Sequence, residues 1–251
     1  MPTLAFDTST SIGAVAVIDG GRLLTERTWN RDTSHGELLT PAIEETLQSA
    51  GISFSLLTRL IVGIGPGSFT GCRISVNVAR ALSFALKLSV YPIDTFELIA
   101  AAVPPRSQPL LVALRGQKNS TLASTFVWKS DRWARTQSLG SLAISDFERQ
   151  LDLGHGRSVE HDGRDVERRA EPYLGVGSAF QGNEFPEKLK SKILREPGLS
   201  DQVDASSFLT LDRLIELDQR LPSDWKALQA LYLRASSAEE RRDEGFGKRG
   251  P

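Results

Sequence analysis

The sequence predicts an α/β protein of two lobes, each a mixed sheet with helices. Segments with the two-residue period of strands alternate with segments of helical period along its 251 residues. Apolar residues make up 40% of the chain and charged residues 24%, so it can bury a sizeable core. The consecutive prolines at 104–105 disfavour both a helix and a central strand, which marks a boundary. We therefore expect lobes over residues 1–104 and 105–235, and a charged, disordered tail over 236–251.

The first lobe opens with a predicted β-meander. Residues 4–7, 12–18 and 22–29 have strand character, and residues 19–21, Asp-Gly-Gly, suit a tight hairpin. The expected elements that follow are helix 36–50, strand 59–64, helix 73–86, strand 88–93 and helix 95–103.

The second lobe is expected to contain a sheet of its own. Its expected elements are strands 109–114, 121–128, 133–139 and 173–176 and helices 144–151 and 208–217. Residues 154–169 are dense in Gly, Arg, Asp and His without an apolar period, which predicts a surface loop.

Charge and cysteine content exclude several classes of protein. A net charge of -1 and a pI near 6.3 argue against a chain that wraps nucleic acid alone. The single cysteine, Cys72, cannot form an intrachain disulfide or a cysteine-based zinc site, which suits the cytosol. Residues 1–10 lack the pattern of a signal peptide, and no apolar run approaches the roughly 18 residues that a membrane span needs. We expect a cytoplasmic protein without a membrane segment.

The glycine-rich segment 65–71 is the first candidate for anion binding, because a strand, a loop and a helix N-terminus follow one another there. Its candidate contact residues are Gly65, Gly67, Ser68, Thr70 and Gly71. A Walker A loop would need Lys and Ser or Thr after the last glycine, and a dinucleotide fingerprint would need glycine in place of Ser68. The alternative is a structural turn that lets the next helix pack closely on the sheet.

Asp7 and Ser9 form a second candidate for nucleotide contact. The run Asp7-Thr8-Ser9-Thr10 resembles the phosphate hairpin of the actin and sugar kinase superfamily, with Ser9 where that family has glycine. The Ser9 side chain would crowd a nucleotide phosphate, which argues against ATP hydrolysis. Alternatively, Asp7 caps its own turn.

No catalytic or metal residues are assigned from the sequence. None of His35, His155 and His161 has the i, i+4 partner that a helical metal site would need. Ser68 does not lie at the centre of a G-x-S-x-G elbow, and Cys72 is better explained as a small core residue than as a nucleophile.

Three segments together resemble the bacterial TsaB (YeaZ) family. They are Leu4–Thr10, Ser34–Leu39 and Gly65–Ile74, and the third, GPGSFTGCRI, is the most specific. Leu231–Arg234 resembles the family's C-terminal tyrosine-leucine-arginine element. A departure from the family is the run 113–119, which lacks the usual aspartate. The resemblance implies an actin-like ATPase (ASKHA, ribonuclease H-like) fold.

The resemblance also implies a function and partners. Family members form a heterodimer with TsaD, which the TsaE ATPase joins. TsaD transfers a threonylcarbamoyl group to N6 of the adenosine beside the anticodon in tRNAs that read codons beginning with A. We therefore expect a non-catalytic subunit that contacts tRNA through the complex and binds no cofactor of its own, ATP being used by the wider complex. A homodimer is expected when the partner is absent.

If the family's packing holds, the helices 36–50 and 73–86 form the partner surface. The implied interface residues are His35, Leu39, Ile43, Leu47, Ile74, Val78, Ala79 and Leu82. Three rival interpretations stay open: an active ATP-using enzyme of the same superfamily, a self-associating scaffold and, last, a glycoprotease.

Overall fold

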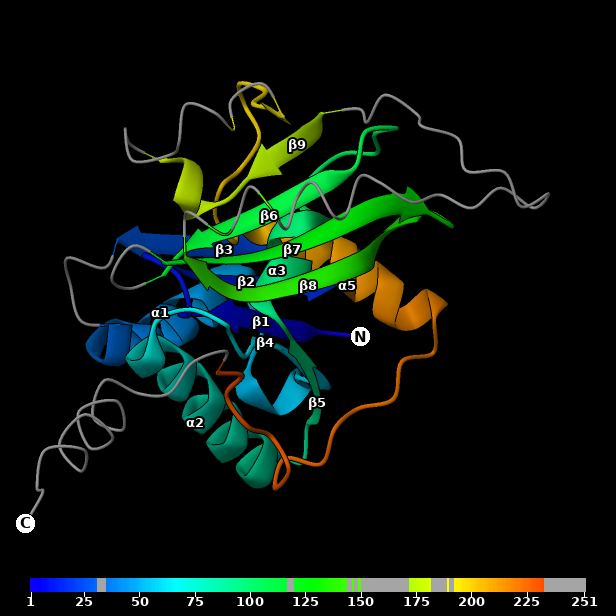
Figure 1. Ribbon diagram of the computed structural model, residues 1–251. Helices are drawn as coiled ribbons and strands as arrows, with labels where there is room; N and C mark the ends of the chain where they lie inside the picture. The colour runs from blue at the N-terminus through cyan, green and yellow to red at the C-terminus, as the bar shows by residue number, and fades with distance from the viewer. Residues whose placement is uncertain are drawn as a thin grey trace, which may run out of the picture.

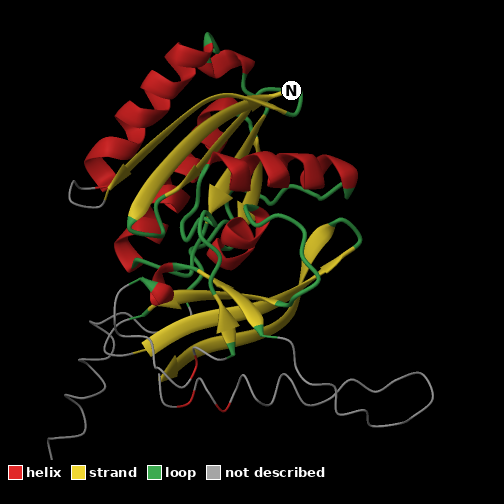
Figure 2. Cartoon of the chain, turned by 90° about the horizontal axis from the view of Figure 1, so that it is seen from above, coloured by secondary structure: helices red, strands yellow, loops and turns green. Residues whose placement is uncertain are grey.

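Two five-stranded sheets form the framework of the computed structural model (Figure 1). The structure describes residues 1–30, 35–116, 120–143, 146, 149, 172–181, 189 and 192–232. The sheets lie in separate layers with helices between them and on the outer face of the first sheet (Figure 2). This arrangement confirms the predicted α/β class with two mixed sheets.

The first sheet has the strand order β3-β2-β1-β4-β5. Its strands are β1 (Thr3–Asp7), β2 (Ile12–Asp19), β3 (Arg22–Asn30), β4 (Arg59–Gly63) and β5 (Ser89–Ile93). The first three form the expected antiparallel meander. On the other side of β1, β4 pairs with β1 and β5 pairs with β4, both in parallel. The carboxyl ends of β1, β4 and β5 therefore meet at one edge, where the candidate residues follow.

Helices cover both faces of this sheet. On one side α1 (His35–Ala50) and α2 (Phe69–Leu86) pack on alternate residues of β1, β2 and β4. On the other side α3 (Thr95–Ala101) and α5 (Ala205–Leu217) fill the space between the two sheets. Because both faces are covered, β1 and β4 are buried along their whole length.

The second sheet has the order β10-β9-β6-β7-β8. Its strands are β6 (Leu110–Arg115), β7 (Ser120–Lys129), β8 (Arg132–Ala143), β9 (Tyr173–Val176) and β10 (Ile193–Leu194). Alternate residues of β6 face α3 and α5, and the others form a small core on the far side. Two short 3-10 helices, η1 (Phe54–Leu56) and η2 (Ser178–Phe180), complete the described elements.

The segment 220–232, called here the strap, returns from α5 to the first sheet. The Ser223 backbone N–H donates to the Val90 carbonyl oxygen at 2.8 Å, which covers the edge of β5. Leu228 enters the core between the sheet and α2, and the Leu231 N–H donates to the Ile64 carbonyl oxygen at 2.7 Å. The strap thus ends beside the glycine-rich segment.

Several boundaries differ from the sequence predictions for identifiable reasons. α2 begins at Phe69 rather than at residue 73, because the Ser68 side chain caps it by accepting from the Gly71 N–H. α5 begins at Ala205 rather than at 208, because Asp204 and Ser207 form a capping box. The two-residue strand β10 was not predicted. Most of the expected helix 144–151, the expected loop 154–169 and the expected tail 236–251 lie outside the described residues. No helix in the described part has the length and apolarity to cross a membrane.

Candidate functional site

The two nucleotide-contact candidates, the turn after β1 and the segment 65–71, lie in direct contact. The Ser68 N–H donates to the Ser9 carbonyl oxygen at 2.7 Å. The Thr8 hydroxyl donates to the Gly71 carbonyl oxygen at 2.7 Å, and the Thr8 N–H donates to the Ser75 hydroxyl at 3.0 Å. The structure therefore brings together the residues that sequence analysis had treated as separate motifs.

The glycines of the segment permit this close packing. A Cβ added at Gly67 would overlap the Ser9 carbonyl oxygen, and one at Gly71 would overlap the Thr8 carbonyl oxygen. Gly65 has a φ of 98°, which side chains rarely adopt. These constraints support the structural-turn alternative, in which glycine is needed so that α2 can approach the turn after β1. Contact with an anion remains a prediction.

Asp7 is completely buried in this junction. Its Oδ2 accepts from the Ser9 backbone N–H at 3.1 Å and from the Ser9 hydroxyl at 3.0 Å, so Asp7 caps its own turn. Its Oδ1 lies against Gly63 and has no hydrogen-bond partner among the described residues. Burial raises the pKa of Asp7 to about 6, although the hydrogen bonds from Ser9 act in the opposite direction.

Ser9 stands where the phosphate hairpin of the actin and sugar kinase superfamily has glycine. Its N–H, its carbonyl oxygen and its hydroxyl all form hydrogen bonds within the chain. Its hydroxyl pairs with the Thr95 hydroxyl at 2.7 Å. Because Ser9 uses its proton on Asp7, Thr95 must donate in this pair. Sequence analysis missed Thr95, although a polar residue two positions after the carboxyl end of a strand, here β5, was a usable signal.

Cys72 lies in the same junction and is buried. Burial, and next the charge of Asp7, raise the pKa of its thiol to about 12. The thiolate is therefore disfavoured, which supports the interpretation of Cys72 as a core residue.

His35 begins α1 but does not face solvent. The Trp29 indole N–H donates to His35 Nδ1 at 3.0 Å, and Nε2 lies 3.2 Å from the Thr10 carbonyl oxygen. These contacts require a neutral ring with its proton on Nε2. His35 is only 6% exposed, and its ring joins α1 to the turn before β2. Its place in a partner interface stays a prediction.

Four apolar interface candidates are likewise buried within the chain, and their place in a partner interface also stays a prediction. Leu39, Ile43, Leu47 and Ala79 are buried in the core between the helices and the first sheet, because their helical spacing follows the sheet-facing stripe. The remaining candidates Ile74, Val78 and Leu82 are half-buried and pack against the edge of that core.

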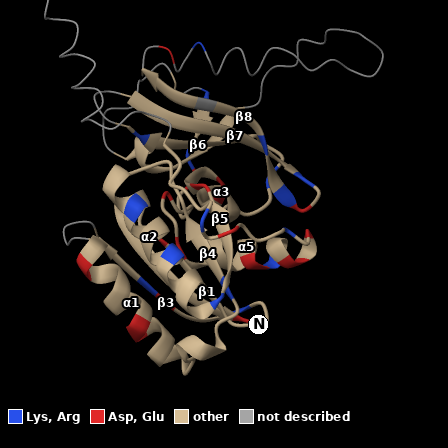
Figure 3. Ribbon diagram, turned by 90° about the horizontal axis from the view of Figure 1, so that it is seen from below, with Lys and Arg blue, Asp and Glu red and all other residues tan. Residues whose placement is uncertain are grey.

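The outward faces of the two helices carry opposite charges. α1 has three glutamates, Glu37, Glu44 and Glu45, and no Lys or Arg, whereas α2 has Arg73 and Arg80 and no Asp or Glu (Figure 3). Sequence analysis judged these helices by their apolar residues and missed this exposed pattern.

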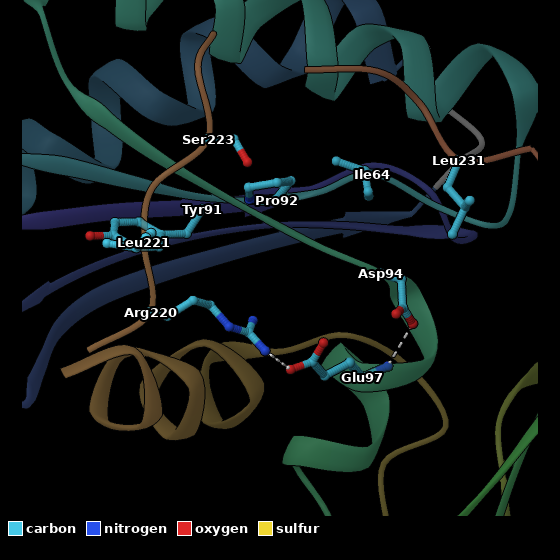
Figure 4. Close-up of a pocket in the computed structure, with 9 residues that line it drawn as sticks. All are labelled: Ile64, Tyr91, Pro92, Asp94, Glu97, Arg220, Leu221, Ser223 and Leu231. Atoms are coloured by element: carbon cyan, nitrogen blue, oxygen red, sulfur yellow. Dashed lines mark hydrogen bonds and ion pairs between the residues drawn. The ribbon is translucent and has the colours of Figure 1, made fainter. Parts of the chain in front are cut away.

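A cavity of about 290 Å³ lies between β5, α3 and the strap (Figure 4). It is lined by Ile64, Tyr91, Pro92, Asp94, Glu97, Arg220, Leu221, Ser223 and Leu231. Its charged groups are paired: Arg220 contacts Glu97 at 2.8 Å, and Arg135 from β8 contacts Asp94 at 2.6 Å. The described residues contain no group of three His, Cys, Asp or Glu side chains that could hold a metal ion.

Comparison with known proteins gives consistent matches. The family model described as TsaD, tRNA N6-adenosine threonylcarbamoyltransferase, matches residues 23–197, more than half of the chain. The tRNA threonylcarbamoyladenosine biosynthesis protein TsaB of Bacillus subtilis is 25% identical over 204 residues, covering 75% of this chain and 85% of the relative. The protein of the same name from Haemophilus influenzae is 36% identical over 104 residues, 39% of this chain and only 42% of the relative.

Solved structures agree on the fold. The structure of YeaZ from Pseudomonas aeruginosa has a TM-score of 0.69 at 20% identity and covers 92% of this chain and 99% of that chain. A second structure from that organism, with similarity to peptidase YeaZ, has a TM-score of 0.70 at 20% identity and covers 93% and 99%.

Proposed function

The chain belongs to the family of the threonylcarbamoyltransferase model and is similar to TsaB (YeaZ) proteins, and we propose that it is the non-catalytic partner of TsaD. In this proposal the two subunits transfer a threonylcarbamoyl group to N6 of the adenosine next to the anticodon, and the TsaE ATPase joins them. The tRNA is contacted through the complex, since the net charge of -1 gives this chain no excess of positive charge.

One observation carries the non-catalytic part of the proposal. The glycine-rich segment packs directly on the turn after β1, with the Ser68 N–H bonded to the Ser9 carbonyl oxygen. In a phosphate-binding turn such backbone groups would face the nucleotide instead. Here the chain's own backbone fills the space that a nucleotide phosphate would occupy. This favours a non-catalytic subunit over an enzyme that turns over ATP.

The partner surface is proposed to be the outward face of α1 and α2. The apolar stripes of both helices are used within the chain, so the exposed face of α1 is largely polar and charged, whereas that of α2 combines polar residues with apolar ones such as Phe84. Half-buried Ile74, Val78 and Leu82 add apolar area at its centre. A polar rim around limited apolar area is typical of an interface between proteins that are also stable separately.

A rival function, ATP use by this chain alone, is favoured by a single observation. Asp7 has a raised pKa and a buried oxygen without a hydrogen-bond partner in the described part, as some functional carboxylates do. That oxygen, however, faces the backbone of Gly63 rather than the cavity of Figure 4.

The deciding experiment mixes the purified chain with TsaD from the same organism. Size exclusion with light scattering measures the heterodimer and any homodimer, and threonylcarbamoyl transfer to tRNA is assayed with each subunit omitted in turn. A heterodimer whose activity needs both chains, with this chain inert alone, supports the proposal. Saturable ATP turnover by this chain alone would support the rival enzyme, and a homodimer that excludes TsaD would support the scaffold.

A further inference from the structure

An arginine and two aromatic rings form an exposed cluster at the start of α2. The Arg73 guanidinium lies 3.9 Å from the centre of the Phe69 ring, and its Nε donates to the Tyr232 hydroxyl at 3.1 Å. The two rings lie 4.8 Å apart. Tyr232 comes from the end of the strap, so two sequence motifs with no assigned role meet at this point.

The cluster holds Arg73 in a defined orientation. Stacking on Phe69 and the hydrogen bond through Nε fix the guanidinium plane, which reduces the side-chain entropy lost on binding. Nη1 and Nη2 of Arg73 make no hydrogen bond or ion pair to any described residue. These two nitrogens form the fork that pairs with a carboxylate or phosphate through two parallel hydrogen bonds.

The surroundings of Arg73 favour a carboxylate on a protein. A nucleic acid would need several free basic residues along one face. The second arginine of α2, Arg80, donates to the Lys226 carbonyl oxygen, and the neighbouring helix α1 carries only glutamates among its charged residues (Figure 3). An adjoining acidic and basic pair of helices instead suits a protein surface with the opposite arrangement of charge.

We propose that Arg73, positioned by Phe69 and Tyr232, is an anchoring residue of the partner surface and pairs with an aspartate or glutamate of the partner subunit. The proposal rests on the proposed function, because it names the chemistry of that same interface. Arginine and tyrosine are enriched among the few residues that contribute most of the binding energy of protein interfaces. Tyr232 acts as a positioning residue through Nε of Arg73.

The test measures the dissociation constant for TsaD by calorimetry with full-length variants. Arg73→Ala is expected to weaken binding by about 30-fold, the loss typical of an interface anchor. Arg73→Lys should show most of that loss, because an ammonium cannot form the fork. Tyr232→Phe keeps the ring and should weaken binding by about 2- to 10-fold, as for one hydrogen bond. The matched control is Arg22→Ala on β3, which should bind as the wild type does.

Two readouts separate positioning from simple structural damage. Tyr232→Phe should have no further effect in the Arg73→Ala background, because its role runs through that arginine. Arg73→Ala should also flatten the dependence of the dissociation constant on salt. Thermal unfolding of each variant checks that the fold is kept.

Each outcome decides the proposal. Binding by Arg73→Ala within twofold of the wild type overturns it while the proposed function stands. Unchanged TsaD binding with weakened tRNA binding by the complex also overturns it and indicates a phosphate ligand. If the wild-type chain forms no complex with TsaD, the proposed function fails and this inference with it.

Discussion

Replacing Asp7 by asparagine should stabilise the protein at neutral pH. Folding buries the carboxyl completely and raises its pKa from 3.8 to about 6, so the folded state disfavours the charged form. Below pH 3.8 the group is protonated in both states and carries no penalty. As the pH rises through 6 the folded state must accept a buried charge. At about 1.4 kcal/mol for each pH unit between the two pKa values, the penalty reaches about 3 kcal/mol at pH 7.

Urea denaturation of the wild type and of Asp7→Asn between pH 4 and pH 8 measures this difference in the free energy of unfolding. The asparagine oxygen can still accept from the Ser9 N–H, so the turn should keep its geometry. The advantage of the variant should be small at pH 4 and grow to its full value above pH 6. Asp131→Asn, in the exposed turn between β7 and β8, serves as the control. A variant less stable than the wild type at pH 7, or a difference independent of pH, refutes the reasoning and indicates a compensating cation near Oδ1.

Three further predictions concern other buried groups. Asp212→Ala should lower the free energy of unfolding by about 3–5 kcal/mol in urea denaturation, because buried Arg59, which contacts Asp212 at 2.7 Å, would keep only half-exposed Glu216 as a charged partner. A loss below 1 kcal/mol would contradict this. Gly71→Ala should lower the free energy of unfolding by about 1–3 kcal/mol and loosen the packing of α2 on the turn after β1, since its Cβ would overlap the Thr8 carbonyl oxygen. An unchanged melting temperature would show that the loop adapts. Cys72 should resist iodoacetamide at pH 8 in the folded protein and react in urea, because burial raises the pKa of its thiol to about 12. Mass spectrometry measures the labelling, and rapid labelling without urea would disprove the burial of Cys72.

The sequence predicted the order and type of nearly all the described elements. The meander and the strand-loop-helix unit have strong local signals: the two-residue period, the Asp-Gly-Gly turn and the glycine-rich segment. Helix starts were less accurate, because caps such as Ser68 and Asp204 depend on side-chain hydrogen bonds that a hydrophobic pattern does not reveal.

The candidate site was only partly predictable. Local sequence identified Asp7 and the glycines, yet their mutual packing depends on contacts between segments far apart in the chain. Four of the eight interface candidates belong to an apolar helical stripe that packs on the chain's own sheet. In a chain with its own sheet, such a stripe is first used for the core, as Leu39 and Ile43 demonstrate. Tyr232 was singled out by resemblance alone, and only the structure connects it with Arg73.

The return of α5 and the strap has a consequence for biosynthesis. Every strand of the first sheet is complete by residue 93, but on one face β2 and its neighbours are covered by residues 205–217, and one edge is covered by residues 220–232. A nascent chain on the ribosome therefore exposes the apolar side of β2 and the open edge of β5 until the last of these residues emerges. Exposed apolar surface and unpaired strand edges are what chaperones recognise and what aggregates. We expect ribosome-bound chains that end before residue 205 to be sensitive to protease throughout the first sheet, and protection to appear only when residues 205–232 have left the exit tunnel.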